Sequence, residues 1–324
     1  MSADYRHRTP GALRLALGVS VLVAVAAWVV GCGEPRPPVA VGSMPELTVQ
    51  VGSTESVDLA GYFSDPDGDE LSYAATSSDA EVASVAISGD SVAVTGAAIG
   101  SAEITVTASD GSSPASQDFT ASVRLTDRRV LEILYDELGG DGWRENTNWK
   151  TDKPLDEWTR VRTDLDGRVI TLYLQGLSLT GEIPPELGDL SSLEELHLTS
   201  NSLTGEIPPE LSNLASLRFL ELDHNSLTGE IPPELGNLAN LRFLYLRNNS
   251  LTGEIPPELG DLSNLERLDL SINSLTGEIP LDFLNLSSLA LFAWDDNDGL
   301  CLPNTNEFDY WLEGLEGWVG PRCD

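Results

Sequence analysis

The C-terminal half of the sequence repeats itself with an unvarying period of 24 residues. The segment Thr-Gly-Glu-Ile-Pro recurs five times, starting at Thr180, Thr204, Thr228, Thr252 and Thr276. A repeat of this length is a single supersecondary unit that cannot bury its own apolar face, so neighbouring units must stack to form a continuous core. The sequence therefore predicts a solenoid over this region.

Within each unit, the spacing of leucine, asparagine and proline predicts how the chain turns. Six units start at Val169, Leu193, Leu217, Leu241, Leu265 and Leu289, and four carry Leu-x-x-Leu-x-Leu-x-x-Asn-x-Leu in full. Leucines on either side of one residue face the core from a short strand, while the residue between them points outward. The corner asparagine can bond backbone groups of adjacent turns. Pro-Pro pairs cannot continue a ladder and predict a short turn on the convex side.

The two terminal units depart from this pattern. The first has Leu177 where asparagine is expected. The last contains Phe292, Trp294 and Asn297 but lacks the Gly-Glu-Ile-Pro segment. Atypical end units are expected of a stack, because its terminal faces meet solvent.

A helix is predicted just ahead of the repeats. Apolar residues recur at helical spacing after Asp127, which is the predicted N-cap. Trp143, Trp149 and Trp158 follow in a segment of turn residues. They favour a cap over the open end of the core, and a sugar-stacking platform is the alternative.

Residues 127–324 resemble leucine-rich repeats, and the Leu-Thr-Gly-Glu-Ile-Pro segment is similar to the plant-type extracellular members of that family. The resemblance implies a parallel β-sheet horseshoe with short convex turns, a second strand at the Thr-Gly segment, and a sheet face that binds proteins, peptides or glycans. It places an N-terminal cap at 126–168, a six-unit array at 169–300 and a C-terminal cap at 301–324.

Residues 42–125 alternate apolar and polar side chains between turns rich in Gly, Asp and Ser. This pattern predicts half-buried strands in an antiparallel sandwich. The stretch resembles the bacterial immunoglobulin-like and cadherin-like modules of exported proteins, in which an Asp-Pro-Asp-Gly-Asp turn precedes a strand. The predicted fold class is thus multidomain, with an all-β immunoglobulin-like sandwich, a helical N-terminal cap and a leucine-rich repeat solenoid.

The acidic turn of this domain is a candidate calcium site. Asp65, Asp67 and Asp69 could bring hard oxygen ligands around one Ca²⁺. The spacing differs from that of an EF-hand, because Gly68 stands at the fourth place and Thr76 at the twelfth. An acidic turn exposed to water explains the same residues without a metal, and both interpretations stay open.

The first 31 residues predict export. Three arginines precede an almost wholly apolar run over residues 15–30, which is shorter than the roughly 20 residues of a membrane span. The run ends in Val29-Val30-Gly31-Cys32, which resembles the bacterial lipoprotein signal. The resemblance implies a signal peptide at 1–31, a lipidated Cys32 and a proline-rich tether at 32–41. The protein would be anchored to a bacterial membrane, with the outer membrane favoured, and would face the periplasm or the surface. The alternative is an uncleaved signal anchor.

The composition of the chain predicts a disulfide and excludes several classes of metal-binding and nucleic-acid-binding protein. Cys301 and Cys323 are the other two cysteines, and an oxidising compartment would join them in a disulfide. With three cysteines and three histidines, zinc-finger and iron-sulfur proteins are excluded. A formal charge of −34 repels phosphate backbones, so nucleic-acid binding is excluded as well. No cofactor is expected apart from the calcium considered above.

The residues that point outward from the predicted strands form the candidate binding site. Phe219, Phe243 and Tyr245 should be neighbours with Arg247 and Arg267 at their border, because adjacent strands lie about 4.8 Å apart. Aromatic residues and arginine are enriched at interface hot spots, and free drift of outward positions is the alternative. The full candidate set is Tyr173, His197, Phe219, Glu221, Phe243, Tyr245, Arg247, Arg267 and Asp269.

The predicted function is recognition of a protein partner by the concave face. Glycan binding, with Tyr173, Phe243 and Tyr245 as stacking surfaces, and a purely structural spacer are the alternatives. Catalysis is not expected. His197 lies beside two carboxylates and could exchange protons, but no nucleophile completes the group, and an open sheet does little to orient a reacting group.

Overall fold

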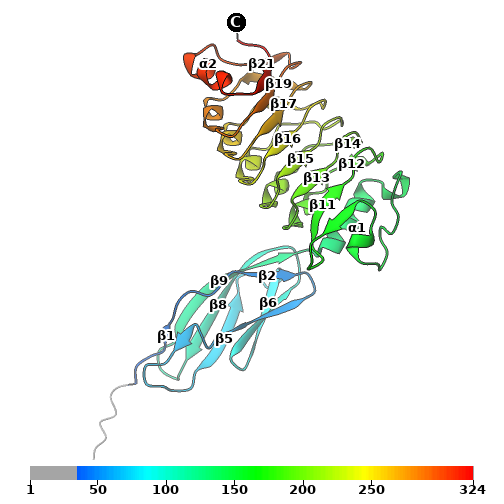
Figure 1. Cartoon of the computed structure of the whole chain (residues 1–324). Helices are drawn as coiled ribbons and strands as arrows, with labels where there is room; N and C mark the ends of the chain where they lie inside the picture. Colours follow the sequence, from blue (N-terminus) through cyan, green and yellow to red (C-terminus); the bar gives the residue numbers. More distant parts are fainter. Residues whose placement is uncertain (1–34, 324) are drawn as a thin grey trace, which may run out of the picture.

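The chain folds into two domains joined end to end, a β-sandwich and a solenoid (Figure 1). The computed structural model describes residues 35–323. The predicted signal peptide at 1–31 and Cys32 lie outside the described residues. Within residues 35–323, no helix has both the length and the hydrophobicity that crossing a bilayer requires.

The sandwich contains a four-stranded sheet, ordered β2-β9-β8-β5, and a three-stranded sheet, ordered β3-β7-β6. The strands of this domain are β1 (Val39–Ala40), β2 (Leu47–Gln50), β3 (Thr54–Asp58), β4 (Phe63–Ser64), β5 (Ser72–Ser77), β6 (Ala83–Ser88), β7 (Ser91–Gly96), β8 (Gly100–Ser109) and β9 (Ala115–Arg124). Alternation decides which side chains are buried, as Val92 and Val94 of β7 show. The buried residues of both sheets form one apolar core, as the sequence pattern predicts.

The sandwich begins earlier than the predicted boundary at residue 42. Pro38 is buried, and β1 pairs antiparallel with β4. Arg36 donates a hydrogen bond to the carboxylate of Asp67 at 2.9 Å. The segment predicted as a tether therefore packs on the domain from Arg36 onward, because pairing with a distant strand satisfies backbone groups that a free tether would leave to water.

The sandwich runs into the solenoid with almost no linker, because Thr126 already caps α1 (Asp127–Glu137). Thr126 has the extended backbone of an N-cap, and its side chain accepts a hydrogen bond from Arg129 N. The predicted cap, Asp127, is instead the first helical residue. Its carboxylate accepts a 2.6 Å hydrogen bond from the backbone N–H of Val169, which ties the helix to the first repeat.

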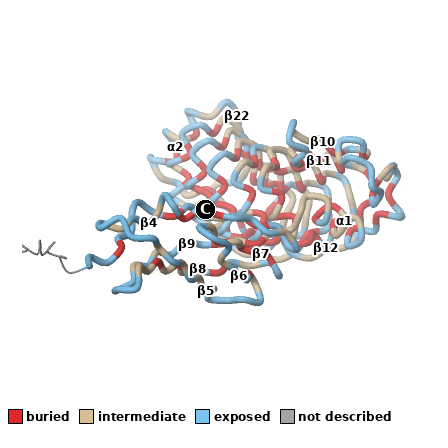
Figure 2. The backbone as a smooth tube through the Cα atoms, turned by 90° about the horizontal axis from the view of Figure 1, so that it is seen from below, coloured by how far each residue is buried: buried red, intermediate tan, exposed pale blue. Residues whose placement is uncertain are grey.

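The three tryptophans that follow α1 are buried, so they offer no platform to sugars. Trp143, Trp149 and Trp158 are each at most 5% exposed. The rings of Trp143 and Trp149 lie 4.8 Å apart, and those of Trp149 and Trp158 lie 5.2 Å apart. They share one continuous core with the repeat leucines, and Figure 2 shows buried segments running along the solenoid.

An eight-stranded sheet runs along the concave side of the solenoid (Figure 1). The six repeats supply its inner strands, and β10 and β22, from outside the repeats, form its two edges. Its strands, in spatial order, are β10 (Val161–Thr163), β11 (Val169–Tyr173), β13 (Glu195–His197), β15 (Phe219–Glu221), β16 (Phe243–Tyr245), β18 (Arg267–Asp269), β20 (Leu291–Ala293) and β22 (Gly317–Val319). Only the pair β10 and β11 is antiparallel. Between consecutive repeats, the register aligns residues that are 24 apart, such as Phe219 with Phe243, so the predicted outward positions fall into straight rows.

Asparagine at each corner holds adjacent turns together. The Asn225 side chain donates from Nδ2 to the carbonyls of Leu198 and Leu222, both at 3.0 Å, and accepts at Oδ1 from Leu203 N at 3.1 Å. The same bonds recur at Asn201, Asn249, Asn273 and Asn297. These amides satisfy backbone groups that would otherwise be buried without a partner.

In most repeats, the Thr-Gly-Glu-Ile-Pro segment leads from a second short strand to a turn on the convex side. The convex side carries five 3-10 turns, namely η3 (Pro185–Asp189), η4 (Pro209–Asn213), η5 (Pro233–Asn237), η6 (Pro257–Asp261) and η7 (Leu281–Asn285). The second strands predicted at the Thr-Gly segment are β12 (Thr180–Glu182), β14 (Ser202–Thr204), β17 (Thr252–Glu254) and β19 (Ser274–Glu278), with β21 (Gly299–Cys301) at the end. In the described chain they form two separate sheets, because residues 226–230 form no strand.

The residue before each corner asparagine has a left-handed backbone. Its φ is 59° at Ser200, 54° at His224, 53° at Asn248, 54° at Ile272 and 52° at Asp296. Small polar side chains tolerate this conformation, whereas a β-branched one is strained by it. We expect Ile272→Asn to raise the free energy of unfolding by about 1 kcal/mol, measured by chemical denaturation. Ser200→Asn is the control and should change stability much less; a destabilised Ile272→Asn protein would contradict the assignment of strain.

The C-terminal segment adds a strand that the repeat pattern does not predict. After the last repeat the chain forms α2 (Asn306–Glu313) and returns as β22, which pairs in parallel with β20. Thr305 caps α2 by accepting a hydrogen bond from Phe308 N. The solenoid therefore ends in a strand drawn from outside the repeats.

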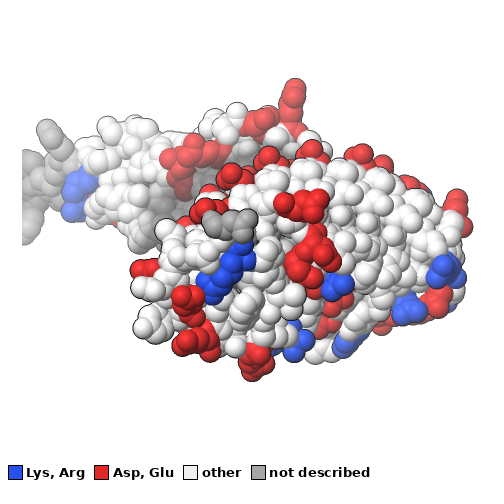
Figure 3. Space-filling view, turned by 90° about the horizontal axis from the view of Figure 1, so that it is seen from above, with Lys and Arg blue, Asp and Glu red and all other residues white. Residues whose placement is uncertain are grey.

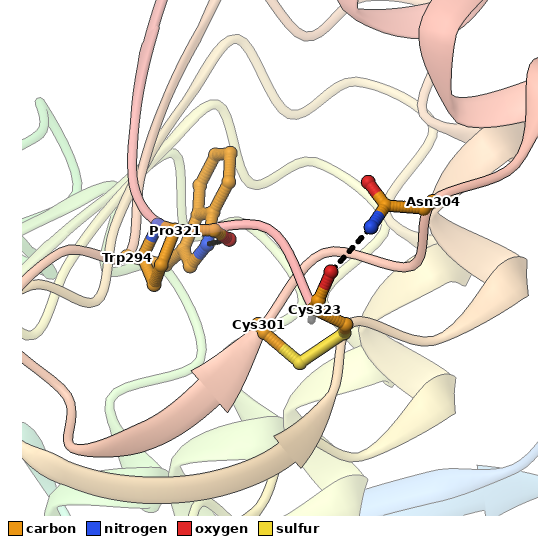
Figure 4. Close-up of a disulfide and its surroundings, with 5 residues drawn as sticks. All are labelled: Trp294, Cys301, Asn304, Pro321 and Cys323. Carbon is orange, nitrogen blue, oxygen red and sulfur yellow. Dashed lines mark hydrogen bonds between the residues drawn. A yellow bond between two sulfur atoms is a disulfide. The ribbon is translucent and has the colours of Figure 1, made fainter.

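Two links hold this last strand in place. Cys301 and Cys323 form the predicted disulfide, with an S–S distance of 2.08 Å (Figure 4). The indole Nε1 of Trp294 donates a 3.0 Å hydrogen bond to the carbonyl of Pro321. Both links join the segment around β22 to the last repeat, so the end of the sheet is fixed.

Candidate binding surface on the concave sheet

Five aromatic rings form a continuous row across the sheet, which we call the aromatic strip: Tyr173, His197, Phe219, Phe243 and Tyr245. Centroid distances between successive rings are 5.1, 6.3, 4.4 and 6.4 Å. Phe219 and Phe243 are nearly parallel, at 11°. All five residues are half-buried, so the cluster predicted to be exposed is partly covered by its own stacking.

Guanidinium groups flank the strip, but they are not the predicted pair. Arg267 lies over the ring of Phe243 at 5.8 Å, as its row position suggests, and Arg242 lies over the same ring at 5.5 Å. Sequence reasoning missed Arg242, which precedes β16 and hydrogen-bonds to Glu266 at 2.7 Å. Arg247 is exposed beyond the end of β16. Within residues 35–323, neither Arg247 nor Arg267 forms an ion pair.

His197 is the most constrained polar residue of the strip. Its Nδ1 lies 2.7 Å from Glu221 Oε2, and its buried Nε2 lies 3.5 Å from Glu195 Oε2. Tyr173 donates from its hydroxyl to Glu195 at 3.1 Å. Burial alone would lower the pKa of His197, but the hydrogen bond and the charge of Glu221, followed by those of Glu195, outweigh it and raise the pKa above its usual 6.5.

The His197 pKa gives a testable pH dependence. Because it is raised on folding, protonation of His197 favours the folded state; this contribution is complete below pH 6.5 and is lost as the pH rises through the folded-state pKa. We expect the NMR titration midpoint of His197 to lie above 6.5 and to fall in Glu221→Gln. Glu234→Gln, on the convex side, is the control. A midpoint that is the same in both variants would show that Glu221 does not hold the proton.

Carboxylates dominate the rest of the surface, and Figure 3 shows them outnumbering basic groups on one face. On the sheet, Asp223 accepts a 2.7 Å hydrogen bond from Thr199 Oγ1, and burial raises its pKa. Asp269 accepts from the backbone N–H of Ser271 at 3.0 Å. These carboxylates are thus partly engaged by neighbouring donors.

An apolar hollow of about 360 Å³ lies at the C-terminal end of the sheet. Tyr245, Arg267 and Asp269 border it on one side, and Trp318 and Val319 of β22 on the other. Sequence reasoning missed the last two residues, which lie outside the repeats. Their only signal in the sequence is an adjacent Trp-Val pair in an otherwise polar segment.

Each of the two domains matches known protein families. The family model described as "Leucine rich repeat" matches residues 171–227, and "Leucine Rich repeats (2 copies)" matches 239–290. The model "Bacterial Ig-like domain (group 2)" matches residues 38–127. The BIR2 ectodomain from Arabidopsis thaliana is 34% identical, with a TM-score of 0.50, and the alignment covers 55% of this chain and 95% of that one. The chain belongs to the leucine-rich repeat proteins.

Two further solved structures are similar to this leucine-rich repeat protein. The structure titled PEPR1-AtPEP1 is 25% identical, with a TM-score of 0.50, and the match covers 60% of this chain but only 30% of that one. The ectodomain of the receptor kinase SOBIR1 from Arabidopsis thaliana is 28% identical, with a TM-score of 0.47, and the match covers 61% and 97% of the two chains. No curated protein sequence matches the chain.

The acidic turn of this leucine-rich repeat protein lies in the sandwich, away from the strip. Asp65 Oδ1 accepts from the backbone N–H groups of Asp67 and Asp69, at 2.7 and 3.1 Å. The Asp67 carboxylate is paired with Arg36, which lowers its pKa. Within residues 35–323, no three His, Cys, Asp or Glu side chains gather as metal ligands would, so the structure does not bring the three predicted calcium ligands together.

Proposed function

We propose that this protein recognises a protein partner through the aromatic strip and the arginines beside it. The observation that carries the proposal is the unbroken row of rings, with Arg267 over Phe243 and without a carboxylate partner in the described chain. The chain has 52 acidic and 18 basic residues, so carboxylates are in large excess and an arginine without an ion pair is unexpected. A partner that supplies the missing contacts would explain it.

The strip has the composition and placement of an interface core. Aromatic residues and arginine carry much of the binding energy of protein interfaces when they cluster centrally. Phe219, Phe243 and Tyr245 remain partly exposed on a sheet whose inward rows are almost fully buried. Their rings pre-stack on one another, which reduces the entropy lost on binding.

The same geometry disfavours the glycan alternative. Sugars stack on the flat faces of aromatic rings, whereas Phe219 and Phe243 cover one another face to face, 4.4 Å apart. A spacer alone would need only the leucines and asparagines and gives no reason for a row of rings. Recognition of a protein accounts both for the face-to-face stacking of Phe219 and Phe243 and for the row of rings.

Comparison with known structures supports this assignment. The BIR2 structure is that of an ectodomain, and PEPR1 was solved as PEPR1-AtPEP1. We propose the same kind of extracytoplasmic role here, with anchoring through a lipidated Cys32 and with binding rather than catalysis as the activity. The lipoprotein-like signal and the disulfide both suit an exported protein.

The test is partner capture by the full chain in detergent extracts of the source cells and their surroundings. Phe219→Ser with Phe243→Ser alters the strip, and Glu234→Ser with Glu258→Ser is the matched control on the convex side. A discrete protein retained by the native and control chains, but lost by the strip variant, is the expected result. Equal recovery by all three, or nothing retained by the native chain, would contradict the proposal.

A further inference from the structure

The hollow at the C-terminal end of the sheet is shaped by a dip in one outward row. Asp269, Ala293 and Val319 are register partners on β18, β20 and β22. Ala293 is the smallest of them, and Leu291 lies beside it on the same strand. The row therefore drops at Ala293 between taller side chains, and this leaves the space of about 360 Å³.

The chain leaves apolar surface uncovered around this space. Val319, the register partner of Ala293, is 56% exposed, and Leu291 is only half-buried. Trp318 is the register partner of the buried Phe292, so its side chain lies on the core face and it lines the hollow only at the edge. Covering Val319 and Leu291 would be favourable at about 25 cal/mol per Å² of apolar surface, yet the hollow cannot close on itself. The disulfide and the Trp294 hydrogen bond to Pro321 fix the segment that carries β22, and Trp318 stacks on Trp294 with ring centroids 5.8 Å apart.

Charge at the rim selects what can fill the hollow. Arg267 is the only basic residue among those lining it. Its guanidinium is held over Phe243 and forms no ion pair within the described chain. Asp269, the only acidic lining residue, already accepts hydrogen bonds from Ser271. The rim therefore favours an anionic group of the ligand, and the hollow beside it favours an apolar group.

We propose that the hollow is the anchor pocket of this binding surface, and that its occupant is an extended peptide segment of the partner. An aromatic or large aliphatic side chain of that segment fills the hollow, and the carboxylate of a neighbouring Asp or Glu pairs with Arg267. This inference rests on the proposed function and adds the chemistry of the partner to it. The aromatic strip then supports the rest of the segment.

Short labelled peptides test this chemistry with the full chain. The probe is fluorescein-labelled Gly-Asp-Trp-Gly-Gly, and the comparison peptides carry Lys in place of Asp or Ala in place of Trp. We expect fluorescence polarisation to show saturable binding of the probe and about tenfold weaker binding of either comparison peptide.

Two variants locate the bound peptide. Ala293→Leu fills the hollow, and Arg267→Gln removes the charge while keeping a long polar side chain at the rim. Each substitution should weaken binding of the probe about tenfold, and only Arg267→Gln should remove the preference for Asp over Lys. Gln175→Leu adds an apolar group outside the hollow and should bind as the native chain does. Equal affinity of the native and Ala293→Leu chains, or no binding by the native chain, would overturn the proposal.

The outcome for the hollow can be separated from the outcome for the strip. In the capture experiment, a partner lost by Phe219→Ser with Phe243→Ser but retained by Ala293→Leu would leave the proposed function standing and remove the hollow from it. A partner retained by both variants would contradict both the proposed function of the strip and the anchor pocket. A partner lost by both, with the probe bound as expected, would support the two proposals together.

Discussion

Replacing Asn225 with alanine is expected to lower the free energy of unfolding by about 3 kcal/mol. The substitution leaves the backbone N–H of Leu203 without its acceptor, and such a buried, unpaired group costs about 1–3 kcal/mol. It also removes one of the two asparagine donors to each of the carbonyls of Leu198 and Leu222, which keep the bonds from Asn201 and Asn249. Chemical denaturation followed by circular dichroism measures the loss.

Asn240→Ala is the matched control for this prediction. Asn240 also donates to a backbone carbonyl, that of Ala215 at 2.8 Å, but it does so where water can take its place. Its replacement should cost under about 1 kcal/mol. If the two alanine variants unfold at the same denaturant concentration, the corner asparagines do not hold the turns together as described. Because stability in a solenoid passes between neighbouring units, an end-unit asparagine such as Asn297 should cost less.

Removing the disulfide is expected to cost about 3 kcal/mol. Cys301 and Cys323 close a loop with a sequence separation of 22, and the bond restricts the unfolded chain. Replacing both with serine should lower the denaturation midpoint under oxidising conditions. Native-state hydrogen exchange should place the loss in β20 and β22, with β13 and β15 little affected, because the link lies at one end of the stack.

A reductant supplies the control. Dithiothreitol should lower the stability of the native chain to that of the double serine variant and leave the variant unchanged. An unchanged midpoint in the variant would mean that packing alone holds the C-terminal segment. Because β22 borders the hollow, the same variant should also weaken the peptide probe if the proposed anchor pocket depends on a fixed edge.

The two parts of the binding surface have different origins. The aromatic strip lies on repeat strands, where the leucine core dictates the backbone and leaves the outward residues free to vary. The hollow arises only where β22, from outside the repeats, meets β18 and β20. We expect specificity for a partner to be concentrated at the hollow, since a side-chain pocket discriminates more sharply than an open row.

Much of this arrangement could be predicted because the period is strict. A repeat of 24 residues with leucines at fixed places leaves one way to stack, so the register of Phe219 with Phe243 followed from spacing alone. The alternation of apolar and polar residues predicted the sandwich in the same way. In both cases the interactions that decide the structure are periodic along the chain.

The rest depended on contacts between residues at no fixed spacing. Arg242, and not Arg247, lies over Phe243, because side-chain direction is set by the ion pair with Glu266. Thr126, and not Asp127, caps α1, because Asp127 bonds to Val169. The sequence by itself determined the solenoid, its rows and the rings along them, since each repeat must bury the same leucines. Only the tertiary structure decided the start of the sandwich, the burial of the tryptophans and the hollow beside β22, since these depend on which distant segments meet.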